Sequence, residues 1–332
     1  MVINDNFYMQ LALDEAWKYQ GLTFPNPAVG CVIVDKNGTL LSIEAHIKAG
    51  EAHAEVRAVM SALKKLNPSL EFPQNAVKQH EFICKNHQNF LKDATVYVTL
   101  EPCNHYGSTP PCALMLATLH VKRVVIGMLD PNNEAAGGKK RLENDKIKVT
   151  CNVLENECQE LLEPFIAWQN GNFSFFKLAQ SVNGVIDGGI ITCKASREFV
   201  HKLRDRTDLL IIGGGTVRED YPTLDARLCG GRAPDVLIYS RQREFDKDMP
   251  LFKIPKRKVH IRSDFEKLKD YKFIMIEGGY GMIHSLPIQT KWFLLFHSPN
   301  FKEGRTVHIN KNLKLLWQGK CGEDSYGWYK NL

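Results

Sequence analysis

Short apolar runs rich in β-branched residues alternate along the chain with segments whose apolar residues recur at helical spacing. The runs have the composition of buried strands, and the intervening segments that of amphipathic helices, so the pattern predicts an α/β fold. Asn37-Gly38 predicts a hairpin turn after the first strand. In the first half the predicted strands are 29–34, 95–100, 123–128 and 146–153, and the predicted helices are 53–66 and 111–120.

The second half repeats this alternation after a helical stretch at 155–171. We therefore place a domain boundary near 150–172. Residues 1–152 and 172–332 are expected to form two domains joined by a linking helix at 153–171. The predicted strands of the second domain are 174–180, 208–215, 235–240, 258–263, 271–279 and 291–298.

Composition narrows the class of protein. An apolar fraction of 44% and a charged fraction of 24% in 332 residues are ordinary for a globular protein of two domains. The first residues have helical spacing up to Gly21 and predict a helix, not a signal peptide, and no apolar run approaches a membrane span. We expect a cytoplasmic location and no membrane partner. The net charge of +6 forms no compact basic stripe, which disfavours nucleic acid and suits anionic small molecules.

The candidate chemistry begins with the cysteines of "LEPCNHYGSTPPC". Nine cysteines without a secretory leader favour metal binding or catalysis over disulfides. Cys103 and Cys112, with His53 upstream, supply three zinc ligands and leave a fourth position for water, the arrangement of catalytic sites. Zinc lowers the pKa of bound water, and Glu55 is placed to take its proton. This order of HxE, PC and a second Cys is the signature of zinc nucleobase deaminases.

Four stretches together resemble one family: "FPNPAVGCVIV" (24–34), "AGEAHAE" (49–55), the cysteine loop and "VKRVVIGMLDPN" (121–132). Eight residues separate Cys103 from Cys112, in place of the two of the PCxxC pattern. Over essentially its whole length the chain resembles the bifunctional deaminase-reductases of riboflavin biosynthesis, the RibD family. The resemblance implies a cytidine-deaminase-like α/β/α domain followed by a dihydrofolate-reductase-like α/β domain.

The resemblance also implies the reactions. The first domain would deaminate 2,5-diamino-6-(5-phosphoribosylamino)pyrimidin-4(3H)-one, and the second would reduce the ribosyl chain to ribityl with NADPH. The partners would thus be phosphorylated pyrimidine small molecules, with one zinc ion per chain. Carried over by position, the first site comprises Glu55 as catalytic residue, His53, Cys103 and Cys112 as metal ligands, and Asn26, His46 and His105 as substrate-binding residues.

In the second half, the stretches "IIGGGTV" (211–217) and "IEGGYGMI" (276–283) each end a predicted strand with glycines. Backbone at such a turn can approach a phosphate closely, and the start of a following helix offers free N–H groups. The family's two substrate arginines are expected to converge on a phosphorylated sugar. By position, the cofactor residues would be Ala179, Thr216, Asp220, Gly278, Gly279 and Gly281, and the substrate residues Lys177, Arg204, Leu224, Arg227 and Glu277.

Two departures from the family pattern leave alternatives open. Ser108 stands where the family commonly has a basic residue, which bears on phosphate recognition in the first site. The segment 181–196 is shortened, with Gly188 and Ile190 at the positions of a substrate serine and a cofactor tryptophan. A monofunctional zinc deaminase with a decayed reductase domain, a nucleic-acid deaminase, and a non-catalytic zinc module with His105 as fourth ligand are the rival hypotheses. Oligomeric state, including a homo-oligomer, and transfer of the intermediate between sites are left open.

Residues 67–92 form an apparent insertion before the strand at 95. His80, Cys84 and His87 would share one face of a helix there and suggest a second metal site. The favoured interpretation is a solvated accessory segment without metal.

Overall fold

The computed structural model describes residues 4–107, 109–132 and 136–332. The chain divides into two compact units, 1–166 and 167–332, each with its own β-sheet. The predicted α/β class is confirmed. Within the described ranges, no helix combines the length and the apolar character that crossing a bilayer requires.

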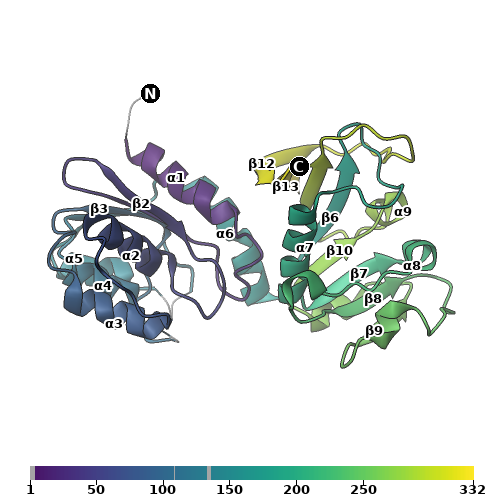
Figure 1. The fold of residues 1–332 in the computed structure, drawn as a ribbon, viewed down its shortest axis with the longest axis horizontal. Coiled ribbons are helices and arrows are strands. Elements are labelled where there is room, and N and C mark those ends of the chain that lie inside the picture. The colour runs from purple at the N-terminus through teal and green to yellow at the C-terminus, as the bar shows by residue number, and fades with distance from the viewer. Residues whose placement is uncertain (1–3, 108, 133–135) are drawn as a thin grey trace. The chain divides into compact units, whose positions relative to one another are not determined.

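The first unit contains a five-stranded sheet in the order β2-β1-β3-β4-β5. β1 pairs antiparallel with β2 and β3, whereas β3, β4 and β5 are parallel. Figure 1 shows α1 on one face of this sheet and α2 on the other. The elements are α1 (Asp5–Trp17), β1 (Gly30–Val34), β2 (Leu40–Ala45), α2 (Ala54–Leu66), α3 (Ala76–Asn86), β3 (Thr95–Leu100), α4 (Cys112–Thr118), β4 (Arg123–Met128), α5 (Gly138–Asn144) and β5 (Lys148–Thr150).

The side chains of β1 point alternately to the two faces of the sheet, and this explains how the strand packs against a helix on each face. Gly30 faces α1 so closely that the carbonyl of Ala12 leaves no room for a Cβ. Cys31 and Ile33 are fully buried in the cluster that includes Val59 of α2. Because successive side chains of a strand point to opposite faces, five buried residues in a row suit a strand covered on both sides.

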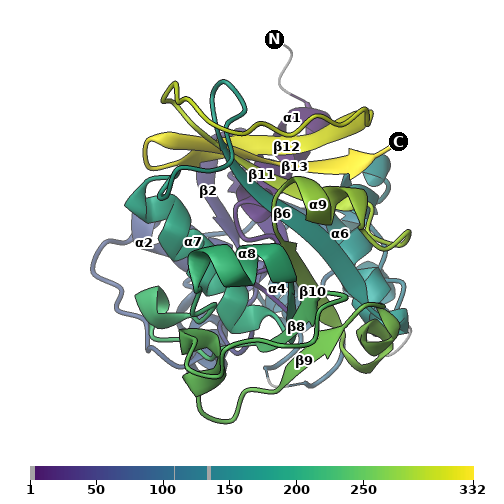
Figure 2. The same ribbon diagram turned by 90° about the vertical axis from the view of Figure 1, so that its right-hand side faces the viewer.

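The second unit contains an eight-stranded sheet in the order β12-β13-β11-β6-β10-β7-β8-β9. Strands β11 to β9 in this order are parallel, and β13 and β12 add an antiparallel edge. Figure 2 shows β12 and β13 at one end of the sheet and β9 at the other. The elements are α6 (Glu155–Asn170), which contains the division between units, β6 (Phe173–Ser181), α7 (Lys194–Arg206), β7 (Leu209–Gly213), α8 (Gly214–Asp220), η1 (Arg227–Cys229), β8 (Asp235–Tyr239), η2 (Pro250–Lys253), β9 (Val259–Arg262), η3 (Glu266–Asp270), β10 (Phe273–Glu277), α9 (Tyr280–His284), β11 (Trp292–Ser298), β12 (Leu313–Cys321) and β13 (Asp324–Asn331).

Three predicted strands are shorter in the structure by three residues or more, and one of them, predicted at 271–279, covers only Phe273–Glu277. The strand predicted at 146–153 covers only Lys148–Thr150, because Lys146 and Asn152 have positive φ angles of 62° and 65°, which extended backbone does not allow. The strand predicted at 208–215 ends at Gly213, and the glycines that follow begin α8. The sequence analysis also missed β12 and β13; no residue of β12 is buried, and its apolar run is only three residues long, at 315–317.

The interpretation of residues 67–92 as a solvated accessory segment holds for most of the segment but not for the inner face of α3. The segment contains α3, whose Ile83 is 0% exposed and belongs to the core of the first unit. His80 is buried as well, and its Nε2 lies 3.1 Å from the carbonyl oxygen of Pro111. Because that oxygen can only accept, His80 donates the hydrogen bond. The inner face of α3 is therefore part of the domain core, and most of the rest of the segment is exposed or half-buried.

Replacement of Ile83 by alanine tests this role of α3. We expect the free energy of unfolding to fall by about 2–4 kcal/mol, because the change leaves a cavity in a closed core. Phe90→Ala, at a position of the same segment that is 39% exposed, is the control and should cost less. Chemical denaturation of the two variants makes the comparison, and equal losses would contradict the core role.

Candidate functional site

Three potential metal ligands meet in the first unit: His53, Cys103 and Cys112. Their ligand atoms all lie within 4.8 Å of one another, and no other group of this kind occurs among the described residues. His53 Nδ1 lies 3.7 Å from the sulfur of Cys103 and 3.5 Å from that of Cys112. With the zinc bond lengths usual for nitrogen and sulfur, a tetrahedral site requires separations of about 3.6 Å. The cluster therefore fits zinc.

Element ends position all three ligands. His53 is the N-cap of α2, Cys112 is the first residue of α4, and Cys103 follows the carboxyl end of β3. Pro111 precedes α4 in extended conformation and fixes where that helix begins. The backbone N–H of Cys112 donates to the sulfur of Cys103 at 3.4 Å. The ligand set thus depends on where two helices start.

The electrostatics of the two thiols favour a cation. The hydrogen bond with Cys112, aided by His53, lowers the pKa of the Cys103 thiol to about 4, which makes it a thiolate. The same hydrogen bond, together with burial, raises the pKa of Cys112. Removing both protons at one buried place requires a positive charge between the sulfurs, and a divalent metal ion supplies it.

Glu55 lies in the first turn of α2, two residues beyond His53, and only 4% of it is exposed. It does not belong to the ligand cluster. Burial, followed by the nearby Cys103, raises the pKa of its carboxyl to about 7. A buried carboxyl beside the metal ligands, with a pKa in the neutral range, is suited to accept and return protons.

The predicted substrate residues Asn26 and His46 are joined to each other. His46 Nδ1 lies 3.1 Å from the carbonyl oxygen of Ala52, so this nitrogen carries the hydrogen and Nε2 accepts from the amide of Asn26 at 3.2 Å. Burial lowers the pKa of His46 to about 4, which keeps the ring neutral. Its ring packs edge-on against that of His53 at 5.7 Å. Both residues therefore border the metal cluster.

His105 does not join that cluster among the described residues and is exposed on the loop after Cys103. This disfavours His105 as a fourth ligand. Ser108 lies outside the described residues. Sequence reasoning missed Glu101, although it stands in the quoted "LEPC". Its buried carboxylate accepts backbone N–H groups at 2.8–3.1 Å and so fixes the chain beside Cys103; the donors are Asp130, Gly137 and Lys139.

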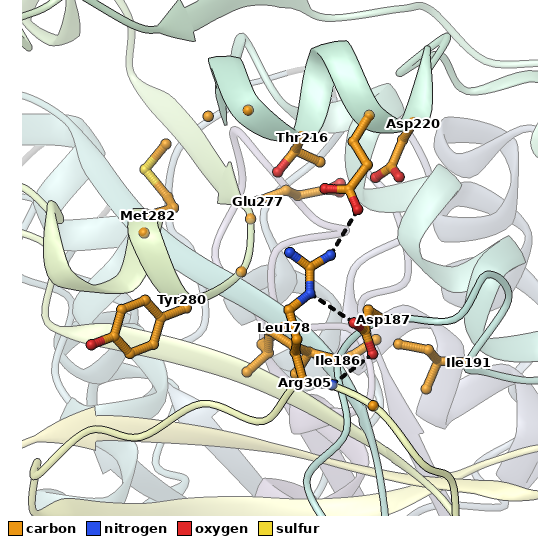
Figure 3. Close-up of a pocket in the computed structure, with 18 of the residues that line it drawn as sticks. Leu178, Ile186, Asp187, Ile191, Thr216, Asp220, Glu277, Tyr280, Met282 and Arg305 are labelled. Carbon is orange, nitrogen blue, oxygen red and sulfur yellow. Dashed lines mark hydrogen bonds and ion pairs between the residues drawn. The ribbon is translucent and has the colours of Figure 1, made fainter.

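The second unit has a cavity of about 1330 Å³ at the carboxyl ends of parallel strands β6, β10 and β7. Ligands of α/β proteins bind at such strand ends, and typical small-molecule pockets measure about 300–1,000 Å³. Gly278, at φ 155°, lets the chain turn there. The predicted residues that line the cavity are Lys177, Ala179, Thr216, Asp220, Glu277, Gly278, Gly279 and Gly281. Figure 3 shows Thr216 and Asp220 on α8 facing the same space as Glu277.

Glu277 is the centre of a buried charge cluster. Arg204 donates to both of its carboxylate oxygens, at 2.9 and 3.1 Å, and Lys177 is its register partner on β6. Burial alone would raise the pKa of Glu277, but Arg204 and Lys177 outweigh it and lower that pKa. Burial lowers the pKa of Lys177. The guanidinium of Arg204 is thus paired with the carboxylate of Glu277.

The remaining predicted substrate residues do not line the cavity. Arg227 pairs at 2.8 Å with the carboxylate of Asp225, whose carbonyl accepts from Arg204 at 3.3 Å. The two arginines are therefore neighbours beside Asp225 and outside the cavity lining, and their role at a sugar phosphate stays a prediction. Leu224 is buried, with a positive φ of 56°.

Sequence reasoning also missed the charged residues at the mouth of this cavity. Arg305, in the segment between β11 and β12, contacts Asp187 and Glu219. Figure 3 shows its guanidinium between Asp187 and α8. All three residues line the cavity. An isolated arginine in "KEGRTV" gave no sequence signal.

Comparisons with known proteins agree with the two units. The family model of the cytidine and deoxycytidylate deaminase zinc-binding region matches residues 2–128, and that of the RibD C-terminal domain matches 175–293. A RibD protein of Mycobacterium tuberculosis is 31% identical over 289 residues, which is 82% of this chain and 77% of that protein. The chain belongs to the RibD family.

Other RibD proteins are similar over a shorter span. That of Aquifex aeolicus is 38% identical over 231 residues, which cover 67% of this chain and 58% of the relative. The matches thus span 55–60% of the length of the first four curated relatives. The crystal structure of a Thermotoga maritima diaminohydroxyphosphoribosylaminopyrimidine deaminase/5-amino-6-(5-phosphoribosylamino)uracil reductase is 26% identical, with a TM-score of 0.65 and 99% of both chains covered. The predicted deaminase-like and RibD reductase-like folds are confirmed.

Metal analysis tests the ligand assignment in this RibD chain. We expect one zinc per chain, and Cys112→Ser should lose most of it because a buried ligand is removed. Cys84→Ser should retain the metal, because His80 bonds Pro111 and His80, Cys84 and His87 form no ligand cluster in the described structure. Elemental analysis of the dialysed proteins checks both. Two zinc ions in the wild type, one of them lost in Cys84→Ser, would contradict this assignment.

Proposed function

We propose that the chain is a bifunctional enzyme of riboflavin biosynthesis. It hydrolyses the 2-amino group of 2,5-diamino-6-(5-phosphoribosylamino)pyrimidin-4(3H)-one and then reduces the ribosyl chain of the product with NADPH. The observation that carries the proposal is the three-ligand cluster of His53, Cys103 and Cys112 beside a buried Glu55, on a chain whose second unit has a glycine-lined cavity. The RibD membership supports assigning both reactions.

In the first site, His53, Cys103 and Cys112 would hold one zinc ion. Bound zinc activates water and acts as a Lewis acid. Glu55 is the catalytic residue, and its carboxyl moves the proton from the attacking water to the leaving amine. Asn26 and His46 are assigned to the pyrimidine by their positions in the family pattern, and their mutual hydrogen bond beside His53 fixes them next to the metal cluster. His105, on the exposed loop, is assigned to the substrate by its position in the family pattern.

In the second site, the cavity would hold the cofactor and the sugar together. Ala179, Thr216 and Asp220 bind NADPH with the glycines that follow β10, Gly278, Gly279 and Gly281, where backbone can approach the dinucleotide. Lys177 and Glu277 face the same cavity and position the sugar. Arg204 acts through Glu277 by holding its carboxylate. Leu224 and Arg227 are assigned to the substrate by the resemblance.

The proposal also covers the location and the binding partners of the protein. A cytoplasmic location is supported by the nine cysteines, none of which forms a disulfide. The partners we propose are phosphorylated pyrimidines, without nucleic acid or membrane. A monofunctional deaminase is the second candidate, because the shortened 181–196 segment leaves Gly188 and Ile190 at family binding positions.

Glu55→Gln tests the deaminase residue. We expect zinc content to be unchanged and deamination to fall by about 10²–10⁴-fold, since the amide cannot shuttle protons. Steady-state assays of ammonia release, together with metal analysis, make the measurement. Near-normal turnover in a zinc-loaded variant would remove Glu55 from the mechanism.

Product identification tests whether the two activities are separate. The purified protein is incubated with the diaminopyrimidine, with and without NADPH, and the products are identified by mass. Folded His53→Ala should lose deamination but still reduce the deaminated intermediate, because its second unit is intact. Asp220→Ala should do the reverse. Thermal melting first confirms that both variants are folded.

The outcomes distinguish the candidates. Deamination without any NADPH-dependent product or NADPH binding would favour the monofunctional enzyme. Loss of both reactions in a folded His53→Ala protein supplied with intermediate would rule out two independent sites.

A further inference from the structure

The cavity of the second unit has an unfavourable charge for the ligands proposed for it. Its lining carries four carboxylates, Asp187, Glu219, Asp220 and Glu277, but only Lys177 and Arg305 as lysine or arginine. Lys177 is half-buried and lies next to Glu277 in the strand register. NADPH and the sugar substrate both carry phosphate groups. A phosphate that enters this lining needs a cation that can leave its present partner.

Arg305 is held in two different ways. Asp187 binds Arg305 at two places. One carboxylate oxygen accepts a hydrogen bond from the backbone N–H of Arg305 at 2.9 Å, and the other accepts one from Nε at 2.7 Å. Glu219 accepts only from Nη2, at 2.7 Å. The guanidinium is therefore anchored at Nε, while its outer edge is occupied by a single carboxylate of α8, as Figure 3 shows.

The contact with Glu219 is the exchangeable one. The side chains of Arg305 and Glu219 are 68% and 61% exposed, and such ion pairs contribute little to stability. Asp187 is only 26% exposed and makes the two other bonds. A phosphate offers a guanidinium two acceptor oxygens in matching geometry and more negative charge than a carboxylate. A phosphate that replaced Glu219 at Nη2 would leave both bonds to Asp187 in place.

We propose that Arg305 is the phosphate-binding residue of this cavity and that Glu219 occupies its outer edge until a phosphorylated ligand takes its place. The inference rests on the proposed reductase function of the cavity and names a residue for it. Either the cofactor or the sugar substrate supplies the phosphate. Arg204 and Arg227 do not line the cavity, so Arg305 is the arginine of its lining that a phosphate can reach.

The test uses three variants of the full chain. Arg305→Ala removes the phosphate partner, and Glu219→Gln removes its competitor. Arg262→Ala is the matched control, because Arg262 also pairs through Nε with an aspartate, Asp264, and through Nη2 with a glutamate, but lies on β9 away from the cavity. We titrate NADPH, NADH and inorganic pyrophosphate into each protein and measure KM for the deaminated substrate.

The two cavity variants should change affinity in opposite directions. Arg305→Ala should weaken binding by about tenfold or more, and Glu219→Gln should tighten it by about threefold. Arg262→Ala should change nothing. Effects on NADPH affinity assign the phosphate to the cofactor, and a larger effect on NADPH than on NADH assigns it to the 2′-phosphate. Effects confined to the substrate KM assign it to the sugar phosphate.

Three results would overturn the proposal. Weakening by both cavity variants would mean that Arg305 only ties α8 to the neighbouring loops. No change in Arg305→Ala would exclude any role in binding. If the wild type neither binds NADPH nor reduces substrate, the proposed reductase function fails. The pyrophosphate titration then tests phosphate binding by Arg305 separately. Equal pyrophosphate affinity in wild type and Arg305→Ala, or no binding to either, would reject phosphate binding by Arg305.

Discussion

Parallel pairing of neighbouring strands is the constraint on which both sites depend. It brings the carboxyl ends of strands to one edge of a sheet, where each strand must turn into a loop or helix. In the first unit β3 runs parallel to β4 and delivers Cys103 at its end. In the second, β6, β10 and β7 end around one cavity. Cys103 and Gly278 stand just beyond the last residues of their strands, whereas His53 and Cys112 are placed by the starts of helices.

The second requirement is that buried polar groups find partners. Glu277 would be costly in the core without Arg204, and Glu101 without the three N–H groups that it accepts. These hydrogen bonds restrict the orientation of functional side chains, because each one fixes the imidazole ring or carboxylate that takes part in it. His46 is the clearest instance, because the Ala52 carbonyl decides which ring nitrogen carries the hydrogen.

The sequence predicted the metal cluster and the central strands because their signals are local. "HAE" and the two cysteines have fixed spacing, and β3 and β4 were predicted at the observed bounds. What it missed depends on contacts between distant segments. The ion pairs of Arg305 join residues 118 and 86 positions away, which no periodicity reveals. The pairing of Arg204 with Glu277 likewise follows from tertiary packing, so the role first expected for Arg204 at a phosphate could not be checked from the sequence.

The hydrogen bond from His80 to Pro111 changes how the extra segment 67–92 should be regarded. It joins α3 to the residue immediately before Cys112, whose position sets one metal ligand. Without His80, the carbonyl of Pro111 would need another donor or water. In this chain α3 thus holds the residue that precedes Cys112 in place. His80 is therefore the position of α3 that is linked to a metal ligand, although it lies 31 residues from Pro111 in the sequence.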